Sequence, residues 1–205
     1  MIAALACAGT LAASARAAES PRAVVEATTS AVIAVLAHKD LSTDEKRRRV
    51  EEIVYARVDF DTLSRLVLAR GWNQLSEKQR GEFEREFKQT LSATYGRNVE
   101  SYKNERVTIV DDRQEARGDW TVRTKIVGHD TDDISVDYRL RQTDGTWKII
   151  DVTIEGVSLV SNYRSQFQAI MTNGGIDRLL ELLREKNARG EPLPAPKGAK
   201  GADQR

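Results

Sequence analysis

The spacing of apolar residues changes twice along this chain, and these changes limit what it can fold into. Up to Tyr102, apolar side chains recur every three or four residues, as on one face of a helix. From Val107 to Ile149 they alternate with polar residues, which is strand spacing, and after Ile149 the helical spacing returns. Because helical and strand segments follow one another in blocks, the pattern predicts an α+β fold with one antiparallel sheet.

Four strands are expected in this sheet, and the two central ones have one apolar and one polar face. The side chains expected to point inward are Trp120, Val122, Thr124, Ile126, Ile134, Val136, Tyr138 and Leu140. Those expected to point outward are Thr121, Arg123, Lys125, Ser135, Asp137, Arg139 and Arg141. Asp144-Gly145 favours a tight hairpin turn before the fourth strand. The apolar face needs a cover, and the helices supply it.

About six helices are expected to wrap the twisted four-stranded sheet. Their predicted starts are Ser20-Pro21, Thr43-Asp44-Glu45, Asp59, the capping box Ser76 to Gln79, a segment from Leu159, and Ile176. We expect Gly71 to end the third helix and Asn173-Gly174-Gly175 to separate the last two. The fourth should be the longest, with Phe83, Phe87, Leu91 and Tyr95 four residues apart on one face.

Composition excludes several classes of function. Lys plus Arg is 32 and Asp plus Glu is 31, so the chain lacks the basic surplus that nucleic-acid binding needs. The chain has one cysteine, Cys7, and two histidines, His38 and His129. A single cysteine excludes a disulfide within the chain and a cysteine-ligated metal site. No phosphate-binding loop or hydrolase motif is present, and we expect no metal site and no cofactor. The cluster Asp130, Asp132 and Asp133 lacks the spacing of a calcium loop and favours a solvated turn.

The two ends of the chain differ from its middle. Residues 1–18 are apolar and rich in alanine, with Ala15-Arg16-Ala17-Ala18 suited to signal peptidase, so we expect a secretory signal peptide and a periplasmic protein. Acylation of Cys7 and a buried alanine-rich helix are the alternatives for this segment. Residues 19–189 are expected to form one domain, and residues 190–205, rich in Gly, Ala, Pro and Lys, a disordered tail.

Several stretches match a known family in the right order along residues 21–183. They are Val58-Asp59-Phe60-Asp61, Leu66 to Trp72, Gln79-Arg80 with Phe83 and Phe87, Trp147 to Val152, Ile154 to Leu159, and Asn162-Tyr163-Arg164 with Gln166-Phe167. The chain resembles the MlaC family, periplasmic phospholipid carriers also called toluene-tolerance auxiliary proteins. The resemblance implies a deep apolar pocket between sheet and helices that holds the acyl chains of a phospholipid. It also implies two partners, an inner-membrane ABC transporter complex and an outer-membrane lipoprotein complex, and we expect a monomer.

The resemblance also suggests which side chains line this pocket. The expected wall consists of Phe87, Leu91, Tyr95, Val122, Ile126, Val136, Tyr138, Ile149, Leu159, Tyr163 and Phe167, although each could equally be ordinary core packing. Arg164 is the candidate for contact with the lipid phosphate, its alternative being an ion pair that braces a helix.

Three alternatives to a phospholipid carrier remain at the level of sequence. Relatives of this family are also associated with hopanoid pathways, and no residue separates the two ligands. Sheets wrapped by helices also occur in small enzymes of the NTF2-like type, in which Asp151 with Tyr138 would transfer protons. An adaptor with a fully packed interior is the third.

Overall fold

The computed structural model of the chain describes residues 19–128 and 133–193 and confirms the α+β class. The predicted signal peptide, the turn from His129 to Asp132 and residues 194–205 of the predicted tail lie outside the described residues.

The N-terminal half consists of helices that start at side-chain caps. Their bounds are α1 Pro21–Ala37, α2 Thr43–Arg57, α3 Phe60–Leu68 and α4 Glu77–Tyr95, with short 3-10 helices at Ala69–Gln74 and Gly96–Val99. Ser42 and Ser76 each form a complete capping box, so the cap of α2 is Ser42 and not Thr43 as expected. Ala69, with φ of 49°, ends α3, whereas Gly71 lies within the following 3-10 helix.

Within the part of the chain that the structure describes, the sheet has five strands, one more than predicted. Their bounds are β1 Arg106–Gln114, β2 Trp120–Val127, β3 Ile134–Thr143, β4 Thr146–Ile154 and β5 Val157–Ser158. All neighbours are antiparallel and follow the order of the chain. The additional strand arises because Glu155 and Gly156, with φ of 48° and 77°, form a tight turn after β4. Two residues are too few to show an alternating pattern.

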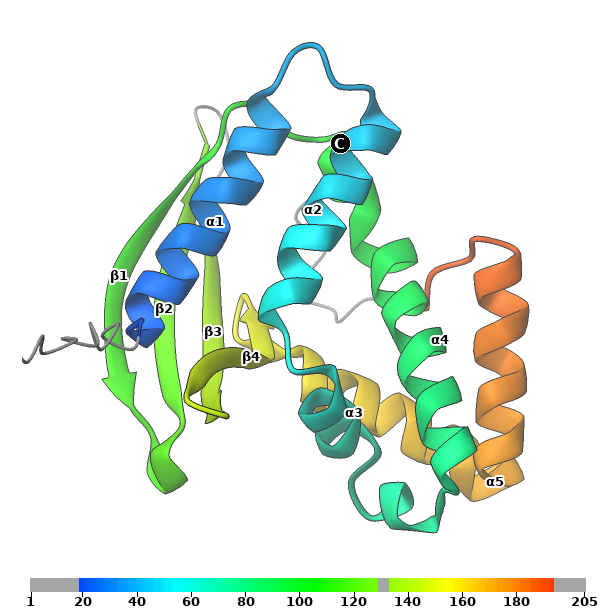
Figure 1. Cartoon of the computed structure of the whole chain (residues 1–205). Coiled ribbons are helices and arrows are strands. Elements are labelled where there is room, and N and C mark those ends of the chain that lie inside the picture. Colours follow the sequence, from blue (N-terminus) through cyan, green and yellow to red (C-terminus); the bar gives the residue numbers. More distant parts are fainter. Residues whose placement is uncertain (1–18, 129–132, 194–205) are drawn as a thin grey trace, which may run out of the picture.

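The two helices predicted after the sheet are joined in one element, α5 Leu159–Ala188. Its backbone breaks at Gly175, where φ is 69° and ψ is −170°. Only glycine adopts this conformation readily, because a side chain there would clash with the backbone. The described residues therefore form five α-helices in place of about six, but the change of direction lies at the predicted position, and Figure 1 shows the two parts of α5 at an angle.

Two separate hydrophobic cores hold this fold together. The helical core joins α3, α4 and α5 and consists of Phe60, Leu63, Val67, Leu68, Trp72, Leu75, Phe83, Phe87, Val160, Tyr163, Phe167, Leu179, Leu180, Leu183 and Leu193. The sheet core joins α1 to β2, β3 and β4 and consists of Val24, Val25, Val122, Leu140 and Ile149. Val58, just after α2, packs against both cores. Leu193 belongs to the helical core although it lies in the predicted tail.

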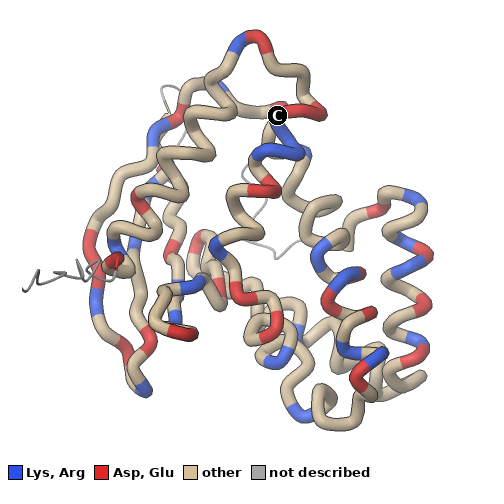
Figure 2. The backbone as a smooth tube through the Cα atoms, viewed as in Figure 1, with Lys and Arg blue, Asp and Glu red and all other residues tan. Residues whose placement is uncertain are grey.

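Helix α1 runs across the sheet, while α3, α4 and α5 gather to one side of it (Figure 1). Charges of both signs are spread over most elements, but α1 carries only Arg22 and Glu26 (Figure 2). An almost uncharged helix is suited to cover an apolar sheet face. The inner face of the sheet is thus covered by α1 over the sheet core.

Candidate functional site

The inner face of the sheet presents the predicted apolar residues of β2 and β3 together. Val122 is paired with Tyr138, and Tyr138 with Val152 on β4. Residues directly opposite each other in an antiparallel sheet share a face, so these side chains form one row. Val122 and Val136 are buried, whereas Ile126 and Tyr138 are half-buried.

Helices α4 and α5 bring the predicted aromatic residues into one tight cluster. The ring of Phe87 lies 5.5 Å from that of Phe83, 5.2 Å from Tyr163 and 5.6 Å from Phe167, measured between centroids. All four side chains are fully buried. Phe87, Tyr163 and Phe167 therefore fill the helical core.

Other predicted wall residues keep accessible apolar surface. Leu91 on α4 and Leu159 on α5 are half-buried and pack against the helical core. Tyr138 is half-buried and packs against the sheet core, which also includes the predicted wall residues Ile149 and Val122. Each of the two cores therefore has half-buried apolar side chains at its surface. The sequence predicted that these side chains line the same pocket.

Tyr95 closes the last turn of α4 with its hydroxyl buried. The ring is half-buried, but the hydroxyl is not accessible and makes no well-aligned hydrogen bond within the described part of the chain. Burial, together with the nearby Tyr163 hydroxyl, raises the pKa of Tyr95. Both tyrosines therefore stay neutral at physiological pH.

None of the residues of α2 is fully buried, and polar contacts join this helix to α4. Its apolar side chains Val50, Ile53 and Val54 are half-buried. Glu51 accepts a hydrogen bond from Ser92 on α4, and the hydroxyl of Tyr55 donates to the carbonyl of Lys88 over 3.2 Å. The apolar face of α2 is therefore a third incompletely covered surface.

Arg164, the predicted headgroup contact, binds a backbone group. Its Nε and terminal nitrogen donate to the carbonyl oxygen of Leu66 over 2.8 and 2.5 Å. The side chain braces α5 against the end of α3. The alternative role predicted for Arg164 was an ion pair with a carboxylate, whereas its partner here is a backbone carbonyl.

Asp151 holds the start of α5. Its carboxylate accepts hydrogen bonds from the Ser158 hydroxyl over 2.6 Å and from the backbone N–H of Val160 over 3.1 Å. Burial outweighs these hydrogen bonds and raises the pKa of Asp151.

Asp151 and Tyr138 do not form the pair that proton transfer would need. Asp151 is opposite Arg139, and Tyr138 is opposite Val152. Since successive residues in a strand point to opposite faces, the two side chains lie on different faces of the sheet. The register shift between Arg139 and Leu140 interrupts the alternation of β4, so Asp151 and Tyr138 do not share a face.

The outward basic residues of the sheet are paired with acids on the same molecule. Arg123 binds Asp111, and Arg139 and Arg141 both bind Asp119. Asp119 is completely covered by these contacts, with Nε to carboxylate distances of 3.0 Å from Arg139 and 2.6 Å from Arg141. Desolvation acts to raise the pKa of Asp119, but the hydrogen bonds from Arg141 and Arg139 prevail and hold it below the usual 3.8.

Replacing Asp119 with asparagine is expected to cost about 1–2 kcal/mol of unfolding free energy at pH 7, because hydrogen bonds to charged groups are lost at a site whose arginines remain solvated. A carboxyl whose pKa is lowered on folding stabilises the protein above its unfolded pKa, and this stabilisation disappears as pH falls through the folded pKa. The difference between wild type and Asp119→Asn should therefore shrink below pH 3.8. Urea unfolding of both proteins between pH 7 and about pH 2.5 measures it, and a difference independent of pH would contradict the assignment.

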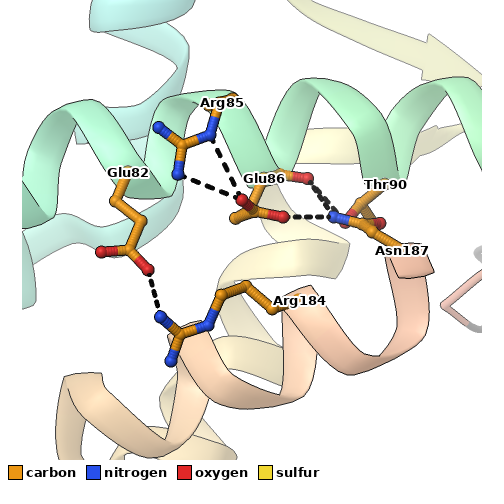
Figure 3. Close-up of polar contacts among 6 residues, drawn as sticks. All are labelled: Glu82, Arg85, Glu86, Thr90, Arg184 and Asn187. Carbon is orange, nitrogen blue, oxygen red and sulfur yellow. Dashed lines mark hydrogen bonds and ion pairs between the residues drawn. The ribbon is translucent and has the colours of Figure 1, made fainter.

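A polar groove of about 700 Å³ lies on the helical side, between α2, α4 and the end of α5. Figure 3 shows the buried carboxylate of Glu86 between Arg85, at 3.3 Å, and the amide of Asn187, at 3.0 Å. Arg184 on α5 binds Glu82 on α4 over 2.8 Å. These contacts fasten α5 to α4, and the groove carries charges of both signs. A smaller hollow of about 450 Å³ is lined by Asn104, Arg106, Val127 and Gly128.

Neither of these hollows carries a metal centre. Across residues 19–128 and 133–193, no three His, Cys, Asp or Glu side chains come together as metal ligands would. Over the same residues, no helix combines the length and apolar character needed to cross a membrane.

Known proteins resemble this chain in both sequence and structure. The toluene tolerance protein ttg2D of Pseudomonas putida is 25% identical over 175 residues, which cover 78% of this chain and 77% of that protein. The solved structure of a phospholipid-binding protein from Ralstonia solanacearum, in complex with a phospholipid, superposes with a TM-score of 0.75 at 26% identity. The superposition covers 82% of this chain and 97% of the other.

A family model adds the decisive match. The model described as "MlaC protein" matches residues 26–185, which include every helix from α2 to the main part of α5 and the whole sheet. Because this match spans well over half of the sequence, the chain belongs to the MlaC family.

Proposed function

We propose that this protein is a periplasmic phospholipid carrier that shuttles lipid between the outer and inner membranes for an ABC transport system. The observation that carries the proposal is the shared fold with the Ralstonia solanacearum protein, which was solved with a phospholipid bound. Membership of the MlaC family supports the same class of ligand.

The division of the interior into two cores supports a ligand between them. Leu91 and Leu159 on the helical core and Tyr138 on the sheet core each retain apolar surface. Leaving such surface open costs free energy, which a bound acyl chain recovers. An acyl chain of ~16 carbons costs on the order of 13 kcal/mol to expose to water, at about 0.8 kcal/mol per methylene. A soluble carrier removes this barrier to transfer between membranes.

The proposed wall divides into an inner lining and a backing. The lining is Leu91, Tyr95, Val122, Ile126, Val136, Tyr138, Ile149 and Leu159. Phe87, Tyr163 and Phe167 stand behind it in the helical core and fix the spacing of α4 and α5. Arg164 keeps α5 against α3 through its contact with the Leu66 carbonyl. We propose that its guanidinium binds the headgroup in addition to this contact.

The proposed setting follows from the ends of the chain and from the family. Residues 1–18 would direct export, and the partners would be the inner-membrane ABC transporter complex and the outer-membrane lipoprotein complex. The absence of a phosphate-binding loop from the sequence is consistent with ATP hydrolysis on another chain.

Native mass spectrometry of the mature chain, purified without detergent, tests the proposal. We expect a phospholipid near one per chain, released by solvent extraction and identified by its fragments. A hopanoid in its place would assign the protein to the hopanoid branch. A chain without ligand, unchanged after incubation with phospholipid vesicles, would contradict the carrier role and favour the adaptor.

A further inference from the structure

Helix α2 packs more loosely than the other α-helices. Across residues 19–128 and 133–193, it is the α-helix with no fully buried side chain. Its apolar residues Val50, Ile53 and Val54 are half-buried. Figure 1 shows α2 between α1, which covers the sheet core, and α4, which belongs to the helical core. Helix α2 thus lies along the boundary between the two cores, where the proposed function places the ligand.

The C-terminal end of α2 is anchored to the sheet by backbone contacts. Val58, the residue after the helix, forms a parallel bridge with Ile149 on β4, and the N–H of Asp59 donates to the Ile149 carbonyl over 2.9 Å. The ring of Tyr55 meets that of Phe60 edge to face, with 5.2 Å between the centroids. This end of the helix is therefore suited to act as a pivot.

The rest of α2 is joined to α4 and to the segment after it by polar contacts. Glu51 accepts a hydrogen bond from Ser92 on α4, and Arg47 pairs with Glu100 over 3.3 Å. The side chains of Arg47 and Glu100 both reach solvent, and such an ion pair contributes little to stability because water solvates the separated charges. The groove of about 700 Å³ between α2, α4 and the end of α5 follows the same seam.

Other openings into the interior would expose more apolar surface. Separating α4 from α5 would uncover Phe83, Phe87 and Phe167, each at most 1% exposed. Lifting α1 off the sheet would uncover Val24 and Val25, which are equally buried. The free energy of an opening rises with the apolar area that it exposes to water. Moving α2 away from α4 exposes side chains that are already half-exposed, so this opening costs least.

We propose that phospholipid enters and leaves the interior between α2 and α4, and that α2 opens this passage by pivoting about its C-terminal end. This inference rests on the proposed carrier function and adds the route of the ligand to it. The contact of α2 with α1 is kept during the movement, whereas the contacts of Glu51 with Ser92 and of Arg47 with Glu100 break. The half-buried apolar face of α2 gives the passing acyl chain a surface to contact.

A cross-link between α2 and α4 tests the proposal. The mature chain contains no cysteine once residues 1–18 are removed, so a variant with Glu51→Cys and Ser92→Cys carries two neighbouring thiols. It is loaded with a fluorescent phosphatidylglycerol and joined by a short bismaleimide, and transfer of the lipid to acceptor vesicles is followed. We expect the cross-link to slow transfer about tenfold or more, because the passage stays closed. Gel filtration should show that the lipid remains bound.

Two controls separate the closed passage from other effects of the cross-linker. Blocking both thiols with N-ethylmaleimide adds bulk without a tether and should leave the rate of transfer unchanged. Glu82→Cys with Arg184→Cys, cross-linked in the same way, joins α4 to α5 where Arg184 binds Glu82, and should also transfer lipid at the rate before cross-linking (Figure 3).

Equal rates before and after cross-linking of α2 to α4 would overturn the proposal. Equal slowing by the cross-link between α4 and α5 would also overturn it, because the effect would then not depend on α2. If wild type acquired no lipid from vesicles, the carrier function itself would fail, and the two failures are therefore distinguishable.

Discussion

Replacing Phe87 with alanine is expected to lower the free energy of unfolding of the delipidated protein by about 3–5 kcal/mol. Phe87 is fully buried, and its ring contacts those of Phe83, Tyr163 and Phe167. Truncation removes these contacts and leaves a cavity that α4 and α5 cannot close, because they are held on both sides of it. Urea unfolding, with the slope checked for a constant change in exposed surface, gives the value.

Phe87→Leu is the matched control, since it keeps most of the volume and should cost less than half as much. A Phe87→Ala loss below about 1 kcal/mol would indicate that the ring borders an open space. Phe87 would then belong to the lining of the pocket and not to its backing.

Replacing Leu91 with aspartate is expected to weaken phospholipid binding by about 100-fold or more. Leu91 is half-buried on α4, so an aspartate there reaches solvent in the empty protein but loses it when an acyl chain is bound. Burying an unpaired carboxylate costs well above 3 kcal/mol, and each 1.4 kcal/mol is about tenfold in affinity. Titration of the delipidated variant with phospholipid vesicles, followed by extraction, measures the loss.

Leu91→Ser separates charge from lost volume and should bind within about tenfold of wild type. Val110→Asp provides the surface control, because Val110 on β1 is 54% exposed. Circular dichroism confirms that each variant is folded before binding is compared. If a folded Leu91→Asp variant bound phospholipid with wild-type affinity, α4 would not line the pocket.

The arrangement of helices and strands could be predicted because it follows from residue spacing. The alternation from Val107 to Ile149 indicates the sheet and its inner face, and the capping box at Ser76 indicates the start of α4. Strand β5 escaped prediction because its two residues, which pair with β4 across a turn at Glu155 and Gly156, are too few to show an alternating pattern.

The candidate site was predictable only as a set of inward faces. Phe87 and Leu91 lie on the same stripe of α4, yet one is fully buried among aromatic rings and the other is half-buried. Spacing shows which side of an element is inward, whereas coverage depends on how far apart the elements pack. The same limit applies to Asp151. The face of the sheet on which it lies depends on a register shift next to Arg139, and no pattern in the sequence of β4 indicates this shift.

Formation of the sheet core requires contacts between segments that are far apart in the chain. Val24 and Val25 on α1 pack against residues of the sheet, and the contact between Arg22 and Asp112 spans 90 positions of the chain. A chain that emerges from its N-terminus first presents the nearly uncharged α1 long before the strands it covers. Contacts so distant in sequence form slowly, because a large loop must close first. During this interval α1 exposes its apolar face, which is the kind of segment that folding chaperones bind.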